Sequence, residues 1–297
     1  MRKILLMFLL LGHVLSAQAA ENEAIRLIQD DELTSTVLKR TASPKLRSAI
    51  ALIYDEQGSR VLYAKNADTI APIASITKLM TAMIVLDAQL PLEEEISISV
   101  QDFDTLKGTH SRMRPGMKLS RGELLKLALM SSENRAAAAL ARTYPGGTVA
   151  AVAKMNAKAH ELGMKNTRFL DPSGLNSGNV STAQDLVKMV QAAQGYDLIQ
   201  KFTTASSHVI DVSGHRPMRF NNTNPLVKSA SWDIGISKTG FINEAGRCLV
   251  MQSKIKGRPV VIVLLDSVGK QTRVGDANRI KKWMESAYAR IYSARQL

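Results

Sequence analysis

The sequence predicts an α+β fold: an antiparallel sheet flanked by helices, with an all-helical lobe inserted between its strands. Two observations lead to this prediction. Strand-like segments lie near both ends of the chain, and the long middle is dominated by helical patterns. One antiparallel sheet completed by distant segments accommodates this order, because the helical middle then forms a lobe beside the sheet. We expect a sheet lobe over about 46–91 and 226–297, and a helical lobe over about 92–225.

The first elements should be a β-hairpin and a buried helix. Residues 49–54 and 60–63 are rich in apolar side chains and flank a turn at 55–58 that ends on glycine. Residues 75–90 are strongly apolar and almost free of charge. A helix without a polar face is expected to be buried on nearly all sides.

Capping residues divide the middle of the chain into helices. Ser120 and Glu123 have the spacing of a capping box ahead of an apolar run, and Ser181 or Thr182 caps a later helix. Helices are expected over about 124–130, 135–142, 148–162 and 183–193. The pattern then returns to strands over 234–238, 248–255 and 259–265, and a helix over about 276–292 follows.

The first nineteen residues have the pattern of a cleaved signal peptide. Two basic residues precede an apolar run over 4–11, and residues 17–19 match the small-x-small pattern that signal peptidase cuts. The apolar run is too short for a bilayer span, which needs about 20 residues. The alternative is an uncleaved anchor or a first buried helix. We expect residues 1–19 to be removed and residues 20–297 to form a single domain outside the cytoplasm.

The formal net charge of +13 limits the classes of partner. A basic cytoplasmic protein suggests nucleic acid, but an exported one meets cell-wall peptides that end in carboxylates and acidic lipid surfaces. Aromatic residues make up 5% of the chain, too few for the platforms on which bases stack. We therefore expect no nucleic-acid partner and at most peripheral membrane association. A generally basic surface that keeps the protein soluble is the alternative explanation.

The sequence contains no pattern for a metal or a cofactor. Its five histidines lack metal-ligand spacing, and no phosphate-binding glycine loop occurs. Cys248 is the only cysteine, which excludes an intramolecular disulfide, and its apolar neighbours predict a buried structural thiol. We therefore expect no cofactor and no metal.

Ser75 and Lys78 are the candidate nucleophile and base. Three residues apart on a helix, they share one face. If that face borders a dry cleft, desolvation disfavours the ammonium form of the lysine, which can then accept the hydroxyl proton. Backbone N–H groups at the start of the helix can also support an oxyanion. The same spacing occurs at Ser253 and Ser267, but we expect the first within a strand and the second at a turn.

Ser132 and Asn134 form a second candidate element between two apolar helices. Serine and asparagine are frequent helix caps, so a structural role is the alternative. Ser177 and Asn179 repeat the spacing in a turn-rich loop, where such residues need no further explanation. We favour Ser132, because a site needs rigid support.

Lys238, Thr239 and Gly240 close an expected strand and form the third element. Gly240 has no side chain, so a substrate backbone can approach the strand edge. Lys238 and Thr239 offer a positive charge and a hydroxyl, which suit a terminal carboxylate. This motif is weak alone, but the order of all three elements is a strong indication.

The three elements resemble the motifs of the penicillin-binding proteins and serine β-lactamases. PIASITKLMTA (72–82) and DPSGL (171–175) are similar to the low-molecular-mass penicillin-binding proteins of peptidase family S11. LMSSENRAA (129–137), GTHSRM (108–113) and residues 238–246 are similar to one subgroup, the D-alanyl-D-alanine endopeptidases of the penicillin-binding protein seven type. The similarity covers residues 48 to about 292.

The resemblance implies a β-lactamase/transpeptidase-like fold and a periplasmic enzyme that hydrolyses peptidoglycan cross-links between D-alanine and meso-diaminopimelate. It implies that Ser75 attacks the D-alanyl carbonyl, with Lys78 as base, and that Ser132 relays a proton to the leaving amine. Which group takes the first proton is left open. β-Lactam antibiotics are implied as covalent inhibitors, and residues 20–297 become a single catalytic domain.

The same resemblance implies the substrate-binding groups. Asn134 would hold the substrate amide, and Lys238 would provide positive charge. Thr239, next to Gly240, would bind the carboxylate beside the cut bond. The backbone N–H groups of Ser75 and Phe241 would form the oxyanion hole.

Several other functions are alternatives to the endopeptidase. A D-alanyl-D-alanine carboxypeptidase commonly has Ser-Gly-Asn as its second motif and a further C-terminal domain, whereas this chain has Ser-Glu-Asn and ends soon after its last helix. A β-lactamase would need a group that hydrolyses the acyl-enzyme, and Glu161 lies in the corresponding region but in a helical pattern. A non-catalytic penicillin sensor usually joins to membrane helices, and a wall-binding module would not need a buried Ser-Lys pair.

Overall fold

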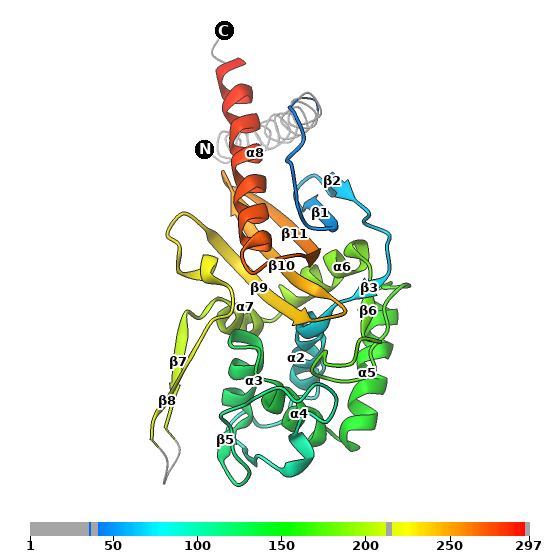
Figure 1. The fold of residues 1–297 in the computed structure, drawn as a ribbon, viewed down its shortest axis with the longest axis vertical. Coiled ribbons are helices and arrows are strands. Elements are labelled where there is room, and N and C mark those ends of the chain that lie inside the picture. Colours follow the sequence, from blue (N-terminus) through cyan, green and yellow to red (C-terminus); the bar gives the residue numbers. More distant parts are fainter. Residues whose placement is uncertain (1–35, 37–40, 212–215, 295–297) are drawn as a thin grey trace, which may run out of the picture. The chain divides into compact units, whose positions relative to one another are not determined.

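The computed structural model describes residue 36 and residues 41–211 and 216–294 (Figure 1). The expected signal peptide, residues 1–19, lies outside this part of the chain. Two compact units are distinguished: Lys45–Lys281, and a second unit formed by Met1–Pro44 together with Lys282–Leu297. The elements described below lie in the first unit, except for the second part of the last helix.

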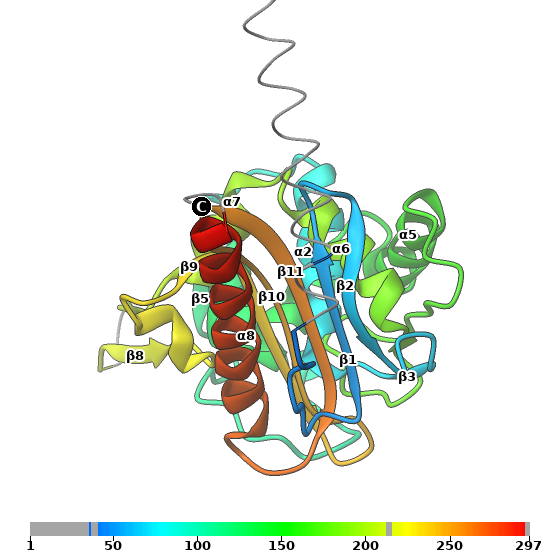
Figure 2. The ribbon, with the colours of Figure 1, turned by 90° about the horizontal axis from the view of Figure 1, so that it is seen from above.

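A five-stranded antiparallel sheet organises the first unit, in the order β2-β1-β11-β10-β9 (Figure 2). Two strands come from the start of the chain and three from its end, which confirms the predicted α+β fold. The strands are β1 (Ile50–Asp55), β2 (Arg60–Lys65), β9 (Asp233–Ile242), β10 (Gly246–Ile255) and β11 (Arg258–Ser267). Residues 260–265 of β11 are all buried, as expected for a continuous apolar run in a strand that is covered on both faces.

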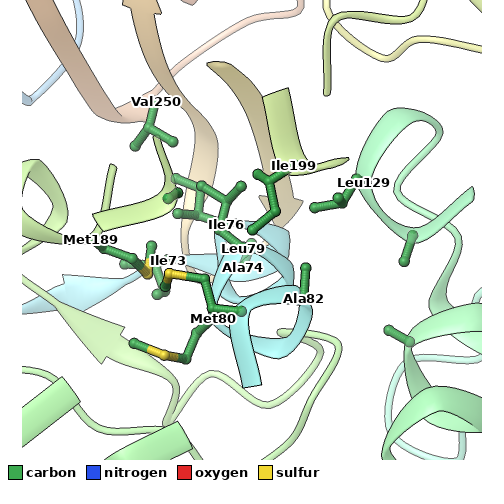
Figure 3. Packing of buried hydrophobic residues seen from close by; sticks show 14 of the residues in the cluster. Ile73, Ala74, Ile76, Leu79, Met80, Ala82, Leu129, Met189, Ile199 and Val250 are labelled. Atoms are coloured by element: carbon green, nitrogen blue, oxygen red, sulfur yellow. The ribbon is translucent and has the colours of Figure 1, made fainter. Parts of the chain in front are cut away.

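Helix α2 (Lys78–Asp87) connects the helices to the sheet. It contacts every one of the helices α3 to α7 and continues the 3-10 turn η1 (Ala74–Thr77), which contacts β9 and β10. Figure 3 shows its apolar side chains among Leu129 of α3, Met189 of α6, Ile199 of α7 and Val250 of β10. Burying a side chain of this size stabilises the fold by about 1.5–3 kcal/mol, so the turn that carries Ser75 is anchored on a firmly packed helix.

Along the chain, the remaining helices lie between β2 and β9, except for the last one, which follows the sheet. They are α3 (Arg121–Met130), α4 (Asn134–Arg142), α5 (Gly147–Glu161), α6 (Ala183–Ala193), α7 (Asp197–Thr204) and, after the sheet, α8 (Thr272–Ala294). The capping box of α3 is confirmed: Ser120 and Glu123 each accept a hydrogen bond from the other's backbone N–H. Thr182, rather than Ser181, caps α6. Within the described residues, no helix is both long and apolar enough to cross a membrane.

Two sequence predictions need correction. The expected helix over 75–90 begins instead as the η1 turn, and its α-helical part ends at Asp87, because Gln89 adopts a left-handed backbone with φ 50°. The Lys238–Gly240 segment does not close its strand. β9 continues to Ile242, since the ladder with β10 extends to the Ile242–Gly246 pair.

Short elements were not predicted, because they are too brief for a hydrophobic period to show. Besides α7, they are the strand pairs β3 (Ala71–Pro72) with β6 (Val180–Ser181), β4 (Glu95–Ser97) with β5 (Lys118–Ser120), and β7 (Ser207–Ile210) with β8 (Met218–Asn221), and the 3-10 turns η2 (Val100–Asp102) and η3 (Pro225–Lys228).

Candidate active site

Ser75 lies in a turn whose backbone is in close contact with two other segments, and a glycine, Gly174 or Gly240, stands at each contact. Ala74 has a left-handed backbone, with φ 48°. A Cβ atom on Gly174 would lie 2.0 Å from the carbonyl oxygen of Ala74, and one on Gly240 would lie 3.1 Å from the backbone nitrogen of Ser75. Only residues without a side chain permit so close an approach of two backbones. The 171–176 loop and strand β9 therefore hold the Ala74–Ser75 peptide from two sides.

Lys78, the first residue of α2, directs its amine at Ser75. Its Nζ lies 2.8 Å from Ser75 Oγ, 2.7 Å from Asn134 Oδ1 and 2.6 Å from the carbonyl oxygen of Ser173. The side chain is fully buried. Burial lowers the pKa of Lys78 from 10.5 to about 7, against the opposing effects of Asp171 and Glu133. A substantial fraction of the amine is thus neutral near pH 7.

The three partners of Lys78 decide where its lone pair points. Asn134 Oδ1 and the Ser173 carbonyl can only accept hydrogen bonds, so they hold two N–H groups of the amine. Ser75 Oγ, by contrast, can accept or donate. When Lys78 loses a proton, its free electron pair therefore faces the Ser75 hydroxyl, as a general base requires.

The loop over 171–176 is part of the site, although its residues were interpreted as ordinary turn formers. The Asp171 carboxylate accepts hydrogen bonds from the backbone N–H groups of Ser173, Gly174 and Asn176. This network places the Ser173 carbonyl against Lys78. Asn179 is fully buried and donates to Thr77 Oγ1 and to the Asp171 carbonyl, so it fastens the same loop to the η1 turn.

Ser132 lines the same cavity as Ser75 and lies in a strained connection between α3 and α4. Its backbone is left-handed, with φ 61°, and Lys238 Nζ donates to its Oγ at 2.9 Å. Glu133, not Ser132 or Asn134, caps α4, so the capping alternative does not account for these two side chains. Asn134 Nδ2 donates to Thr109 Oγ1 at 3.0 Å, which leaves its Oδ1 facing Lys78.

Lys238 supplies a second buried amine. Its Nζ also donates to the Thr239 carbonyl at 2.9 Å. Burial holds its pKa well below 10.5, and the positive charges of Lys78 and Arg273 add to this effect. Thr239 Oγ1 in turn donates to Thr223 Oγ1 at 2.6 Å, so its oxygen is held at the cavity wall.

The predicted site residues converge on one cavity of about 370 Å³. Six of them line it directly: Ser75, Ser132, Asn134, Thr239, Gly240 and Phe241. Lys78 and Lys238 contact its walls from behind through the hydrogen bonds given above. Thr109, Leu175, Thr223, Arg247 and Arg273 complete the lining. A second cavity of about 320 Å³ adjoins it and shares Asn134 and Leu175.

The other Ser-x-x-Lys pairs do not resemble this arrangement. Ser253 Oγ donates to the Asp233 carbonyl, and Ser267 Oγ is hydrogen-bonded to Ser48 Oγ. Neither serine lines the cavity. Cys248 is buried, and burial raises the pKa of its thiol to about 11, which agrees with the predicted structural role. Glu161 is exposed and forms an ion pair with Lys154.

Sequence reasoning missed six residues that contact the predicted site groups or line the cavity: Thr109, Ser173, Leu175, Thr223, Arg247 and Arg273. The DPSGL segment contained a usable signal, because an aspartate followed by Ser-Gly organises backbone N–H groups. The two arginines carried no local signal. Arg247 lines the cavity because the pairing of β10 with β9 places it opposite Phe241. Arg273 lines it because α8 brings this side chain to β9, where it donates to the Gly240 carbonyl at 3.5 Å.

The sequence is similar to known D-alanyl-D-alanine peptidases. The model of the peptidase S11 family, described as D-alanyl-D-alanine carboxypeptidase, matches residues 37–269. The D-alanyl-D-alanine endopeptidase of Pseudomonas aeruginosa is 49% identical over 243 residues, which cover 82% of this chain and 78% of that protein. The D-alanyl-D-alanine endopeptidase of Escherichia coli is 46% identical over 256 residues, covering 86% and 83%. The D-alanyl-D-alanine carboxypeptidase DacF of Bacillus subtilis is 30% identical, covering 84% and 64%.

Solved structures show the same architecture. The DD-transpeptidase of Streptomyces K15 superimposes with a TM-score of 0.76 at 28% identity, covering 82% of this chain and 99% of that one. Penicillin-binding protein D2 of Listeria monocytogenes, solved in its cefotaxime-bound form, gives a TM-score of 0.72 at 27% identity, covering 82% and 99%.

Proposed function

This chain belongs to the peptidase S11 family, and we propose that it is a periplasmic endopeptidase that hydrolyses D-alanyl-meso-diaminopimelate cross-links of peptidoglycan through an acyl-enzyme on Ser75. The observation that carries this proposal is the contact between Lys78 Nζ and Ser75 Oγ, in which a buried amine with a pKa of about 7 faces a cavity-lining hydroxyl. The endopeptidases that are 46–49% identical support the choice of bond.

The first half of the reaction forms the acyl-enzyme. Neutral Lys78 accepts the hydroxyl proton of Ser75 as Oγ bonds to the D-alanyl carbonyl carbon. The backbone N–H groups of Ser75 and Phe241 stabilise the oxyanion. The C–N bond then breaks, and the leaving amine takes a proton from the Ser132 hydroxyl. Lys238, which donates to Ser132 Oγ, stabilises the negative charge that develops there.

The second half releases the acyl group. A water molecule attacks the ester carbonyl and gives its proton to the Ser132 oxygen, which lost its own proton to the leaving amine. The bond from carbon to Ser75 Oγ breaks, and Ser75 Oγ takes back the proton that Lys78 accepted in the first half. Throughout, Asn134 holds the substrate amide from the wall shared by the two cavities.

The substrate carboxylate beside the cut amide binds on the β9 side. Thr239 presents its hydroxyl there, and Gly240 leaves room for the substrate backbone. Lys238 and Arg273 provide positive charge around this position. A β-lactam carries a carboxylate in the corresponding place, so covalent inhibition at Ser75 follows from the same contacts.

The alternative is a D-alanyl-D-alanine carboxypeptidase, the activity for which the family model is described. Both enzymes perform the same acyl transfer and differ only in the amine that leaves. The pattern of residues 1–19 supports export to the periplasm, and we propose that residues 20–297 form the catalytic domain.

Digestion of purified cross-linked muropeptides, followed by mass spectrometry, tests the proposal. We expect cross-linked dimers to be converted to monomers faster than D-alanine is released from monomeric pentapeptide. If D-alanine release dominates while dimers persist, the carboxypeptidase alternative replaces the endopeptidase.

A further inference from the structure

The cavity is strongly basic beside β9, where the proposed function places the leaving group. Arg247 and Arg273 both line it, and none of its lining residues is acidic. Lys238 lies behind the same wall. The two guanidinium groups are close enough for the charge of Arg247 to add to the burial that lowers the pKa of Arg273. Such an accumulation of like charge is unfavourable unless an anion is present.

One substrate carboxylate does not account for all of this charge. Lys238 is committed to Ser132 and to the Thr239 carbonyl. Arg273, which donates to the Gly240 carbonyl, lies beside the position of the carboxylate next to the cut bond. This leaves Arg247 without an assigned anion.

Arg247 is positioned but not neutralised by the protein. It lies opposite Phe241 in the β9–β10 ladder, and its guanidinium carbon is 4.4 Å from the centre of the Phe241 ring. Within the part of the chain that the structure describes, it forms no ion pair. Glu244, in the adjoining turn, is paired instead with Lys107. Stacking on an aromatic ring fixes the guanidinium plane while its N–H groups stay available to a ligand.

The chemistry of the leaving group suggests what binds there. Free D-alanine carries one carboxylate, next to the amide that is cut. A diaminopimelate that leaves as part of a second peptide carries that carboxylate and at least one more, farther along the chain. Arginine is suited to such a group, because its planar guanidinium can form two hydrogen bonds with a carboxylate.

We propose that Arg247, stacked on Phe241, is a specificity-determining residue that binds a second carboxylate of the leaving peptide and so favours cross-linked peptides over D-alanine as the leaving group. This inference rests on the proposed endopeptidase function. The inference adds to that function the residue that distinguishes the two leaving groups.

The test compares Arg247→Gln with Lys254→Gln. Lys254 is exposed on the same strand, β10, and does not line the cavity. Its substitution therefore removes one positive charge, as Arg247→Gln does, but at a position outside the cavity. Three substrates that share the same acyl donor and differ in the leaving group are needed. They are the pentapeptide, the cross-linked dimer, and a dimer in which the carboxylates remote from the cut amide are converted to amides. In the unsubstituted protein, amidation should lower kcat/KM about tenfold, as expected for one charge-assisted hydrogen bond. In Arg247→Gln it should have almost no effect, whereas Lys254→Gln should behave like the unsubstituted protein.

A merely structural role for Arg247 would lower turnover of all three substrates without removing the effect of amidation, and that result would overturn the inference. A second measurement does not depend on turnover. The free diaminopimelate-containing tripeptide should slow acylation by penicillin, and its inhibition constant should rise about tenfold in Arg247→Gln only. If dimers are not cut but this dependence is found, the endopeptidase proposal fails and the anion site stands. If dimers are cut and neither measurement depends on Arg247, only the inference fails.

Discussion

Lys78 Nζ lies 2.8 Å from Ser75 Oγ, while two acceptors that cannot donate, Asn134 Oδ1 and the Ser173 carbonyl, occupy the other two directions of the amine. The lysine is therefore oriented as well as desolvated. Orientation comes from residues on α4 and on the 171–176 loop, and desolvation comes from the packing around α2.

The nucleophile is tested by covalent labelling. The protein should take up one penicillin, and Ser75→Ala should take up none, because only at Ser75 do two further acceptors of the neighbouring amine turn its free electron pair toward the hydroxyl. Ser132 instead accepts a hydrogen bond from Lys238. Intact-mass spectrometry and peptide mapping give the readout. Labelling at Ser253 or Ser267 in the variant would contradict the assignment.

The rate of penicillin acylation should rise with pH through about 7. The pKa of Lys78 is lowered from 10.5 to about 7, so the amine is protonated and inactive as a base below that value and neutral above it. On the acid side the rate should fall about tenfold per pH unit. A flat profile across this range would show that Lys78 does not act as the base.

Glu133→Gln should move this pH profile to lower pH. Burial lowers the pKa of Lys78, and the negative charge of Glu133 opposes that shift. Removing the charge therefore lowers the pKa further, while the amide oxygen can still cap α4. Glu161→Gln, an exposed change on α5, is the control and should leave the profile in place. A shift to higher pH would exclude the electrostatic explanation.

The choice between the two Ser-x-Asn segments is tested by paired alanine variants. Ser132→Ala should lower peptide turnover by a factor of about 10² or more, the usual scale for lost proton transfer. Ser177→Ala should stay within about threefold of the unsubstituted protein, because Ser177 does not line the cavity. A larger loss in Ser177→Ala than in Ser132→Ala would show that Ser177, and not Ser132, takes part in the proton transfer.

The close contact at Gly174 is tested against a glycine of similar conformation. Gly174 and Gly257 have φ values of 82° and 81°, but a Cβ on Gly174 would lie 2.0 Å from the Ala74 carbonyl and one on Gly257 would meet nothing within 4 Å. Gly257→Ala should cost about 1 kcal/mol of stability and still acylate normally. Gly174→Ala should lose acylation by about 10² or more, because the Ser75 turn must move. Similar behaviour of the two variants would indicate backbone strain alone.

Local patterns were sufficient for much of the fold. The Ser120–Glu123 capping box, the first hairpin and the three C-terminal strands depend on spacing within a few residues, which the sequence displays directly. The end of α2 and the extent of β9 were misjudged, because Gln89 has a left-handed backbone and the β9 ladder is extended by pairing with β10. These outcomes are decided by neighbours rather than by propensity.

By itself, the sequence determined the α+β order of elements and the three motifs, since each motif is a short run of residue types in a recognisable local setting. Only the tertiary structure decided that Lys78 is desolvated, that Ser173, 95 residues away along the chain, contributes a carbonyl to it, and that Arg247 and Arg273 face the same cavity. The physical reason is that burial, pKa and charge accumulation arise from contacts between distant segments, and such contacts leave no pattern in the residues beside them.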